Sequence, residues 1–400
     1  MRRIREIRTI AALAVLALLL GGCNTGTGPS GITRVNPRGS SLPVQASPVY
    51  FIDPTATVQG ALEISNDVFV GPFAEISTGA SRVRIGAQTD IQDNASVDAD
   101  VGREVDLGDR VILAHGASVR GPAVIGASGG LAAFVGFNAL VDGGTVEPNA
   151  MVGIMARLGP GVRLRSGLKI LPGKNVTTQT EADDPALGKV ALVTGADMAF
   201  MDGVIAVNID FARGYAAVQA NNRLSVRGIG ENPSTTLNPV PDTPTMDGVP
   251  TVNPFFRNRI IGEIHFEDSL ALLDLRMGSR DSARADEGKE FRIGQLGGMA
   301  DDVVIHALEH TSVFIGDGNV FGSGVIVHGG DDSGNVPHDT TRIEDGVTVG
   351  AGAVVFRATI GDNCVIGVRA LVDGSQLAAG TVVADRAIIV KNVSLGFVEC

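Results

Sequence analysis

Residues 105–125 read VDLGDRVILAHGASVRGPAVI, and this stretch decides the fold. Large aliphatic residues stand at every sixth position, at Leu107, Leu113, Val119 and Ile125, with small or turn-forming residues between them. Such a period is typical of a β-solenoid, in which each hexapeptide forms one side of a coil and the aliphatic side chains stack into a continuous core. A β-sandwich is the alternative, but its strands do not keep a fixed six-residue register over many turns.

The same period occurs before this stretch and returns late in the chain. Its further members are Ile64, Val70, Ile76, Ile85, Ile91, Val97, Ile315, Phe321, Val327, Ile343, Val349, Val355, Ile360, Ile366 and Val372. The pattern also repeats as a whole, because Ile85-Gly86 matches Ile293-Gly294 and Gly121 matches Gly329, both at a separation of 208 residues. We therefore predict a mainly β fold of two tandem left-handed parallel β-helix modules.

The modules are predicted at residues 49–220 and 255–400. Residues 221–254 contain several prolines with Asn, Thr and Asp, which indicates an extended linker. At the end of module one, residues 178–188 and 201–221 have the character of helices, and we expect them to pack along the side of the solenoid. No equivalent pair of helices is expected in module two.

The first residues have the character of a targeting segment. Four arginines precede an apolar run over residues 10–20, which is too short to span a bilayer. The run ends in Leu20-Gly21-Gly22-Cys23, which resembles the bacterial lipobox. We predict a lipoprotein signal peptide at 1–22, lipidation of Cys23, a flexible tether at 23–48, and a lipid-anchored place in the cell envelope, at the outer membrane or its periplasmic face. An ordinary secretory signal with an incidental cysteine is the alternative.

Composition excludes some functions. The formal net charge is −12, and the chain has no Trp and only two Tyr, so it offers neither a basic face nor stacking aromatic residues for nucleic acid. Apart from Cys23 the cysteines are Cys364 and Cys400, which are far apart in sequence. Two such thiols do not make a disulfide framework, and no bridge is assumed.

Several segments of both modules resemble γ-class carbonic anhydrases. They are FIDPTATVQG (51–60), VGPFAEI (70–76), DIQDN (90–94), LAHGASVRGP (113–122), NVTTQTEAD (175–183), AVNIDFARGY (206–215) and IHALE (305–309). The resemblance covers nearly all of module one and much of module two. It implies reversible hydration of CO2 to bicarbonate at a metal ion held by three histidines. Zinc suits such a ligand set, and so do iron(II) and cobalt(II).

Neither module has all three of these ligands. The family's three positions fall on Asp98, His115 and Arg120 in module one, and on His306, Ser323 and His328 in module two. In the family, the first and third ligands come from one subunit and the middle one from its neighbour. The resemblance therefore implies that His306 and His328 join His115 in one complete site, at an interface between a module one and a module two.

The resemblance assigns further residues to this site. It implies that Arg284 and Asp286 hold the interface, and that Glu287 and Glu309 handle protons. In module one, Gln92 would hydrogen-bond the metal-bound solvent, and Asn208 would be a further catalytic residue.

Two other functions remain open at this stage. The loss of ligands from each module is also what a non-catalytic scaffold of this family would show, and His115 would then survive by chance. A hexapeptide acyltransferase shares the solenoid, but a lipoprotein outside the cytoplasm would lack acyl-CoA. One chain with two modules cannot fill a three-position ring evenly. We therefore expect an oligomer with trimer-like packing of modules, or a homologous partner chain.

Overall fold

The computed structural model describes residues 48–99, 102–221, 257–286, 289–308, 311–330 and 340–400. The predicted signal peptide, Cys23, nearly all of the tether and nearly all of the linker lie outside these residues, as do Glu287 and Glu309. The described residues belong to one compact unit, which begins at Ser47. Within this part of the chain, no helix combines the length and apolar character that crossing a bilayer needs.

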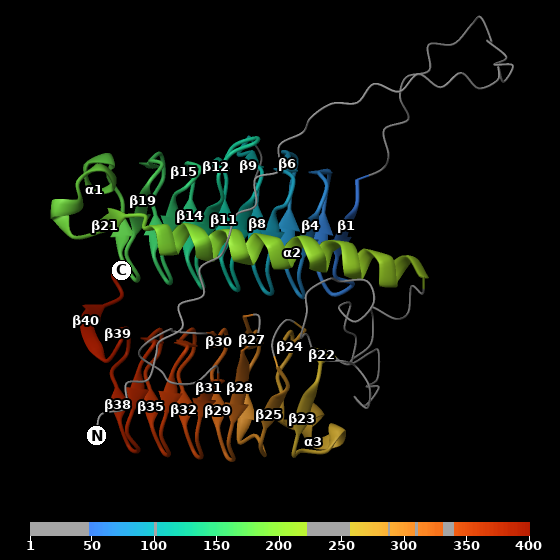
Figure 1. Cartoon of the computed structure of the whole chain (residues 1–400), viewed down its shortest axis with the longest axis vertical. Coiled ribbons are helices and arrows are strands. Elements are labelled where there is room, and N and C mark those ends of the chain that lie inside the picture. The colour runs from blue at the N-terminus through green and yellow to red at the C-terminus, as the bar shows by residue number, and fades with distance from the viewer. Residues whose placement is uncertain (1–47, 100–101, 222–256, 287–288, 309–310, 331–339) are drawn as a thin grey trace, which may run out of the picture. The chain divides into compact units, whose positions relative to one another are not determined.

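Module one is a β-helix of three sheets, in which every strand pairing is parallel except the last one in the first sheet (Figure 1). The first sheet contains β1 (Tyr50–Ile52), β4 (Val68–Val70), β7 (Asp90–Ile91), β10 (Val111–Leu113), β13 (Ala133–Val135), β16 (Met151–Val152), β19 (Leu168–Ile170) and β21 (Val190–Leu192). The second contains β2 (Thr57–Gln59), β5 (Glu75–Ser77), β8 (Ser96–Asp98), β11 (Ser118–Arg120), β14 (Leu140–Asp142), β17 (Arg157–Leu158) and β20 (Asn175–Val176). The third contains β3 (Leu62–Ile64), β6 (Val83–Ile85), β9 (Val105–Leu107), β12 (Ala123–Ile125), β15 (Thr145–Val146) and β18 (Arg163–Leu164).

Module two has the same architecture. Its first sheet contains β22 (Arg259–Gly262), β24 (Ser282–Ala285), β27 (Val304–Ala307), β30 (Ile326–Gly329), β33 (Val354–Phe356), β36 (Leu371–Asp373), β39 (Ala387–Val390) and β40 (Val393–Phe397). The second contains β23 (Ile264–Phe266), β25 (Phe291–Ile293), β28 (Ser312–Ile315), β31 (Thr340–Ile343), β34 (Thr359–Ile360) and β37 (Gln376–Leu377). The third contains β26 (Gly298–Met299), β29 (Val320–Phe321), β32 (Thr348–Val349), β35 (Val365–Ile366) and β38 (Val382–Val383). The predicted class, two β-helix modules, is confirmed.

The six-residue pattern forms the two cores. Ile85, Leu107 and Leu113 are completely buried, and so are the equivalent residues of module two, such as Ile315. In the regular coils Met151 pairs with Lys169, so one turn takes 18 residues, or three hexapeptides. The coils stack so closely that a Cβ atom on Gly86 would lie 2.4 Å from the backbone of Gly108. Only glycine fits there.

In the described part of the chain, four helical segments accompany the strands. The helix expected at 178–188 is present as α1 (Gln179–Asp183) and the short 3-10 helix η1 (Pro185–Leu187). The second expected helix is α2 (Gly195–Asn221), which begins six residues earlier than predicted. It begins early because Thr194 and Asp197 cap its first turn, each accepting a hydrogen bond from the other's backbone N–H. A short helix in module two, α3 (Leu270–Arg276), was not predicted.

The two modules pack on each other through their first sheets, which we call the interface sheets. Ile112 and Phe134 of module one belong to the same buried apolar cluster as Val304 and Ile326 of module two. Helix α2 lies lengthwise between the modules, and its buried residues Met201, Val204 and Ile205 join this cluster (Figure 1). Burial of these side chains holds the two modules together.

Candidate metal centre

The structure brings His115, His306 and His328 together in one place. One ring nitrogen of each lies within 4.8 Å of those of the other two, and all three side chains are buried. Nε2 of His115 is 3.0 Å from Nδ1 of His306. Both modules of a single chain therefore contribute to this group.

The β-helix geometry places each of these rings. His306 on β27 and His328 on β30 are paired in register on neighbouring strands, so their rings project from the same face of the module-two interface sheet. His115 stands at the corner that follows β10, where Gly116 has a φ of +67°. Asn138, at the equivalent corner of the next coil, donates its backbone N–H to the carbonyl oxygen of His115. Its side-chain amide donates to the carbonyl oxygen atoms of Gly324 and Gly352 in module two.

The second nitrogen of each ring faces an acceptor. Nδ1 of His115 is 3.1 Å from Oδ2 of Asp93, and Nε2 of His306 is 3.4 Å from Oδ1 of Asp286. Nδ1 of His328 lies 2.6 Å from the carbonyl oxygen of Gly329. Acceptors of this kind fix the orientation of metal-binding histidines in proteins.

The two carboxylates belong to a buried network across the interface. The Arg284 guanidinium donates to both oxygens of Asp93 in module one, at 3.0 Å, and to Asp286 at 2.6 Å. The Tyr215 hydroxyl of α2 also donates to Asp286, at 2.6 Å. Burial, the largest single effect, would raise the pKa of both carboxyl groups. Arg284 together with the neighbouring histidines, and with Tyr215 in the case of Asp286, outweighs it, so the pKa of Asp93 is well below its usual value and that of Asp286 is about 2. Both are therefore ionised and able to accept from the histidines.

Burial has the opposite effect on the imidazoles. It lowers the pKa of His115 to about 4, although the Asp93 carboxylate opposes the change. Burial and the neighbouring histidines lower the pKa of His328 well below its usual value. At neutral pH these rings are uncharged and each keeps a lone pair for a metal ion. The donor set of three converging imidazoles, each oriented by an acceptor, fits zinc, iron(II) or cobalt(II).

A small cavity of about 20 Å³ adjoins His328, and we call it the histidine cavity. Its walls are Gln92, Ala114, Phe134, Phe137, Phe200, Val204, Leu308, His328 and Phe356. The space is about that of one water molecule. Nε2 of Gln92 donates to Oδ2 of Asp90 at 2.7 Å, and the Gln92 side chain forms part of the wall of this cavity.

Of the other predicted site residues, the structure places some at the site and others away from it. Arg284 and Asp286 lie at the contact between modules, and Gln92 lines the histidine cavity. Asn208 is buried on α2, donates to the carbonyl oxygen of Val204, and is not part of the cavity wall. Glu287 and Glu309 lie outside the described residues.

Sequence reasoning missed several residues of the site. Asp93 follows Gln92 directly in the DIQDN segment, and Tyr215 ends the AVNIDFARGY segment, so both had a signal. A second buried ion pair between the modules, between Asp53 and Arg259 at 3.1 Å, had none. The aromatic wall of the cavity also had no sequence signal.

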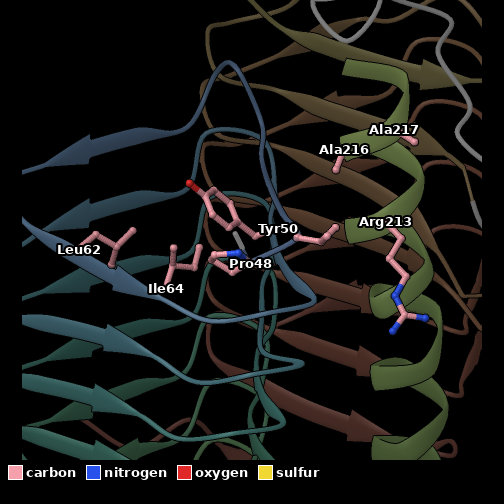
Figure 2. Close-up of a pocket in the computed structure, with 8 residues that line it drawn as sticks. Pro48, Tyr50, Leu62, Ile64, Arg213, Ala216 and Ala217 are labelled. Carbon is pink, nitrogen blue, oxygen red and sulfur yellow. The ribbon is translucent and has the colours of Figure 1, made fainter. Parts of the chain in front are cut away.

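Two other features do not belong to this site. A cavity of about 700 Å³ at the first coil of module one is lined by Tyr50, Leu62, Ile64 and Arg213 and contains no histidine (Figure 2). Glu263, His265 and Glu290 lie close together on the surface of module two, where Arg292 pairs with Glu290 at 2.7 Å. The described thiols of Cys364 and Cys400 are both free.

Comparison with known proteins identifies the family to which this chain belongs. The chain is 32% identical over 207 residues to the carbonic anhydrase of Methanosarcina thermophila. The matched region covers 46% of this chain and 78% of that enzyme. A hexapeptide transferase family protein from Anaplasma phagocytophilum is 20% identical with a TM-score of 0.35, over 42% of this chain and 89% of that one. No family model matches. The chain belongs to the γ-class carbonic anhydrase family.

Proposed function

We propose that this protein catalyses the reversible hydration of CO2 to bicarbonate, at a metal ion held by His115, His306 and His328 of one chain. The observation that carries the proposal is the convergence of these three buried imidazoles from two modules, neither of which has the full set. Membership of the carbonic anhydrase family supports the reaction class. Zinc is the proposed ion, with iron(II) or cobalt(II) as alternatives.

A divalent ion bound there supplies Lewis-acid activation of water at neutral pH. The chain's own residues orient the reactants. Oε1 of Gln92 accepts a hydrogen bond from the attacking water, because its Nε2 is already engaged by Asp90. Phe134, Phe137 and Phe356 form an apolar wall that suits CO2 and excludes bulk water. Asp93 and Asp286 keep the imidazoles oriented.

Three parts of the proposal rest on sequence alone. Glu287 and Glu309 are proposed to transfer the proton to solvent. Cys23 is proposed to carry a lipid that holds the protein in the cell envelope. The two modules are proposed to descend from one duplicated ancestor, because their matching residues keep a 208-residue separation.

Metal analysis together with CO2 hydration assays tests the function. The purified mature protein should contain up to one transition-metal ion per chain and hydrate CO2. His115→Ala and His328→Ala should each abolish both properties, whereas the control His265→Ala, which changes an exposed histidine, should preserve both. A metal-free and inactive wild-type protein would overturn the proposal and support the scaffold alternative. An unchanged metal content in His115→Ala would overturn the shared site.

A further inference from the structure

A larger cavity of about 480 Å³ adjoins the histidine cavity, and we call it the vestibule. It lies between the two interface sheets and the first turns of α2. Four aromatic residues line both spaces: Phe134, Phe137, Phe200 and Phe356. The aromatic side chains are therefore the partition between the vestibule and the space beside His328.

The far end of the vestibule reaches the protein surface, and its lining there is charged. Lys391 is exposed, and the Lys169–Asp197 and Arg357–Asp373 ion pairs, at 2.6 and 2.8 Å, lie beside it. The vestibule thus combines apolar walls, which suit CO2, with a charged and polar rim, which suits the ion bicarbonate.

Of the four aromatic residues in the partition, Phe200 is the freest to move. Phe137 and Phe356 pack on the His328 ring, with centroid distances of 4.9 and 5.4 Å, so a displacement of either would disturb that imidazole. Phe134 is buried on a strand. Phe200 is half-buried near the start of α2 and touches Phe134 edge to face, with their centroids 5.7 Å apart.

We propose that the vestibule is the passage between solvent and the histidine cavity, and that Phe200 sets its width. The molecules that pass through it, CO2 inward and bicarbonate outward, are inferred from the proposed function. The passage itself rests on the shared aromatic wall. Phe200 is a positioning residue in this proposal, because it controls access and takes no part in the chemistry.

Two substitutions change the passage in opposite directions. Phe200→Ala removes the movable ring, and Ile154→Trp enlarges a side chain that lines the vestibule but not the histidine cavity. The matched control is Phe314→Ala, which removes a half-buried ring from β28 in the second sheet of module two. The ring contacts of the three histidines are with one another and with Phe137 and Phe356 in the described structure, and do not include Phe200 or Phe314.

Metal-free protein is treated with diethyl pyrocarbonate, and modification of His328 and of the exposed His265 is followed by mass spectrometry. In Phe200→Ala, loss of the edge-to-face contact with Phe134 should raise the rate of His328 modification about fivefold. Ile154→Trp should lower that rate by a similar factor, with Phe314→Ala and the rate at His265 unchanged. Unchanged His328 rates in both vestibule variants would overturn the proposal and place the access route elsewhere.

A second measurement follows azide binding to the cobalt-loaded protein by stopped-flow absorbance. The association rate should follow the same order, fastest in Phe200→Ala and slowest in Ile154→Trp. If both measurements respond in this way but no variant hydrates CO2, the passage stands and the proposed function fails. If CO2 is hydrated while neither rate responds, the proposed function stands and the passage is wrong.

Discussion

The two modules differ most at the positions where this family has its histidines. In module two, His306 and His328 lie on the interface sheet and are buried against module one. The matching residues of module one, Asp98 and Arg120, lie on β8 and β11 and are exposed. The middle position shows the reverse, because His115 is buried whereas Ser323 of module two is exposed. At these three family positions, each module thus has a histidine only on the face that meets the other module.

This difference shows that the family's ligands are kept where the two modules meet and are lost on the faces that lie outside this contact. Within a single chain, the face of module two that has the first and third ligands meets the face of module one that has the middle ligand. A two-module chain creates one contact of this kind. Within the described residues, an imidazole at a family position outside that contact has no partner imidazoles with which to complete a three-histidine site.

Arg284→Ala should have the largest effect on stability. It removes the cation that holds Asp93 and Asp286 together at the contact and leaves two buried carboxylates without their shared counter-charge. The expected loss is about 3–5 kcal/mol in the free energy of unfolding. Urea denaturation measures it, and the exposed Arg292→Ala serves as the control. A loss below that of the control variant would show that the network does not hold the modules together.

Asp281→Asn should make stability less dependent on pH. Asp281 precedes β24 at a corner that Ala74 occupies in module one, and burial raises the pKa of its carboxyl group to about 7. The folded protein therefore holds a proton that the unfolded chain releases near pH 4, and stability falls as pH rises from about 4 to about 7. Neutral asparagine should raise stability at pH 8 by on the order of 2 kcal/mol, with no gain at pH 4.

Thermal unfolding at several pH values checks this result. The backbone N–H of Val303 donates to Oδ1 of Asp281, and the asparagine carbonyl oxygen can accept the same bond. A gain of equal size at pH 4 and pH 8 would exclude the ionisation of Asp281 as its cause.

Tyr215→Phe should have a moderate effect that divides between stability and metal binding. It removes the hydroxyl that donates to Asp286, which in turn faces His306. We expect a loss of about 1 kcal/mol in stability, and a metal affinity about tenfold lower. Competition with a chromophoric chelator gives the affinity. Lower stability with unchanged affinity would mean that Asp286 does not orient His306.

The double substitution Asp98→His with Arg120→His should have almost no effect on metal content. It restores the family's first and third ligands on module one, but β8 and β11 face solvent, away from His115. Plasma mass spectrometry should still give the wild-type metal content. A second tightly bound ion per chain would show that these exposed faces meet a middle-ligand face in an assembly.

The sequence predicted the cores because their signal is local: an inward aliphatic residue must recur at each side of a coil, and Leu107 and Ile315 follow that rule. It also predicted which histidines meet, through a resemblance to proteins that divide their ligands between subunits. It did not predict that both contributing modules belong to the same chain. The wall residue Phe200 was missed because its position depends on where α2 packs, and the start of α2 was missed because the Thr194–Asp197 cap precedes the apolar pattern.

X-ray absorption spectroscopy of the zinc-loaded protein tests most directly whether both halves of one chain hold the same ion. Three imidazole nitrogens at about 2.0 Å are expected in the wild type. In His115→Ala, any zinc that remains should have at most two imidazoles. Two imidazoles in the wild type, or three retained in His115→Ala, would contradict the account.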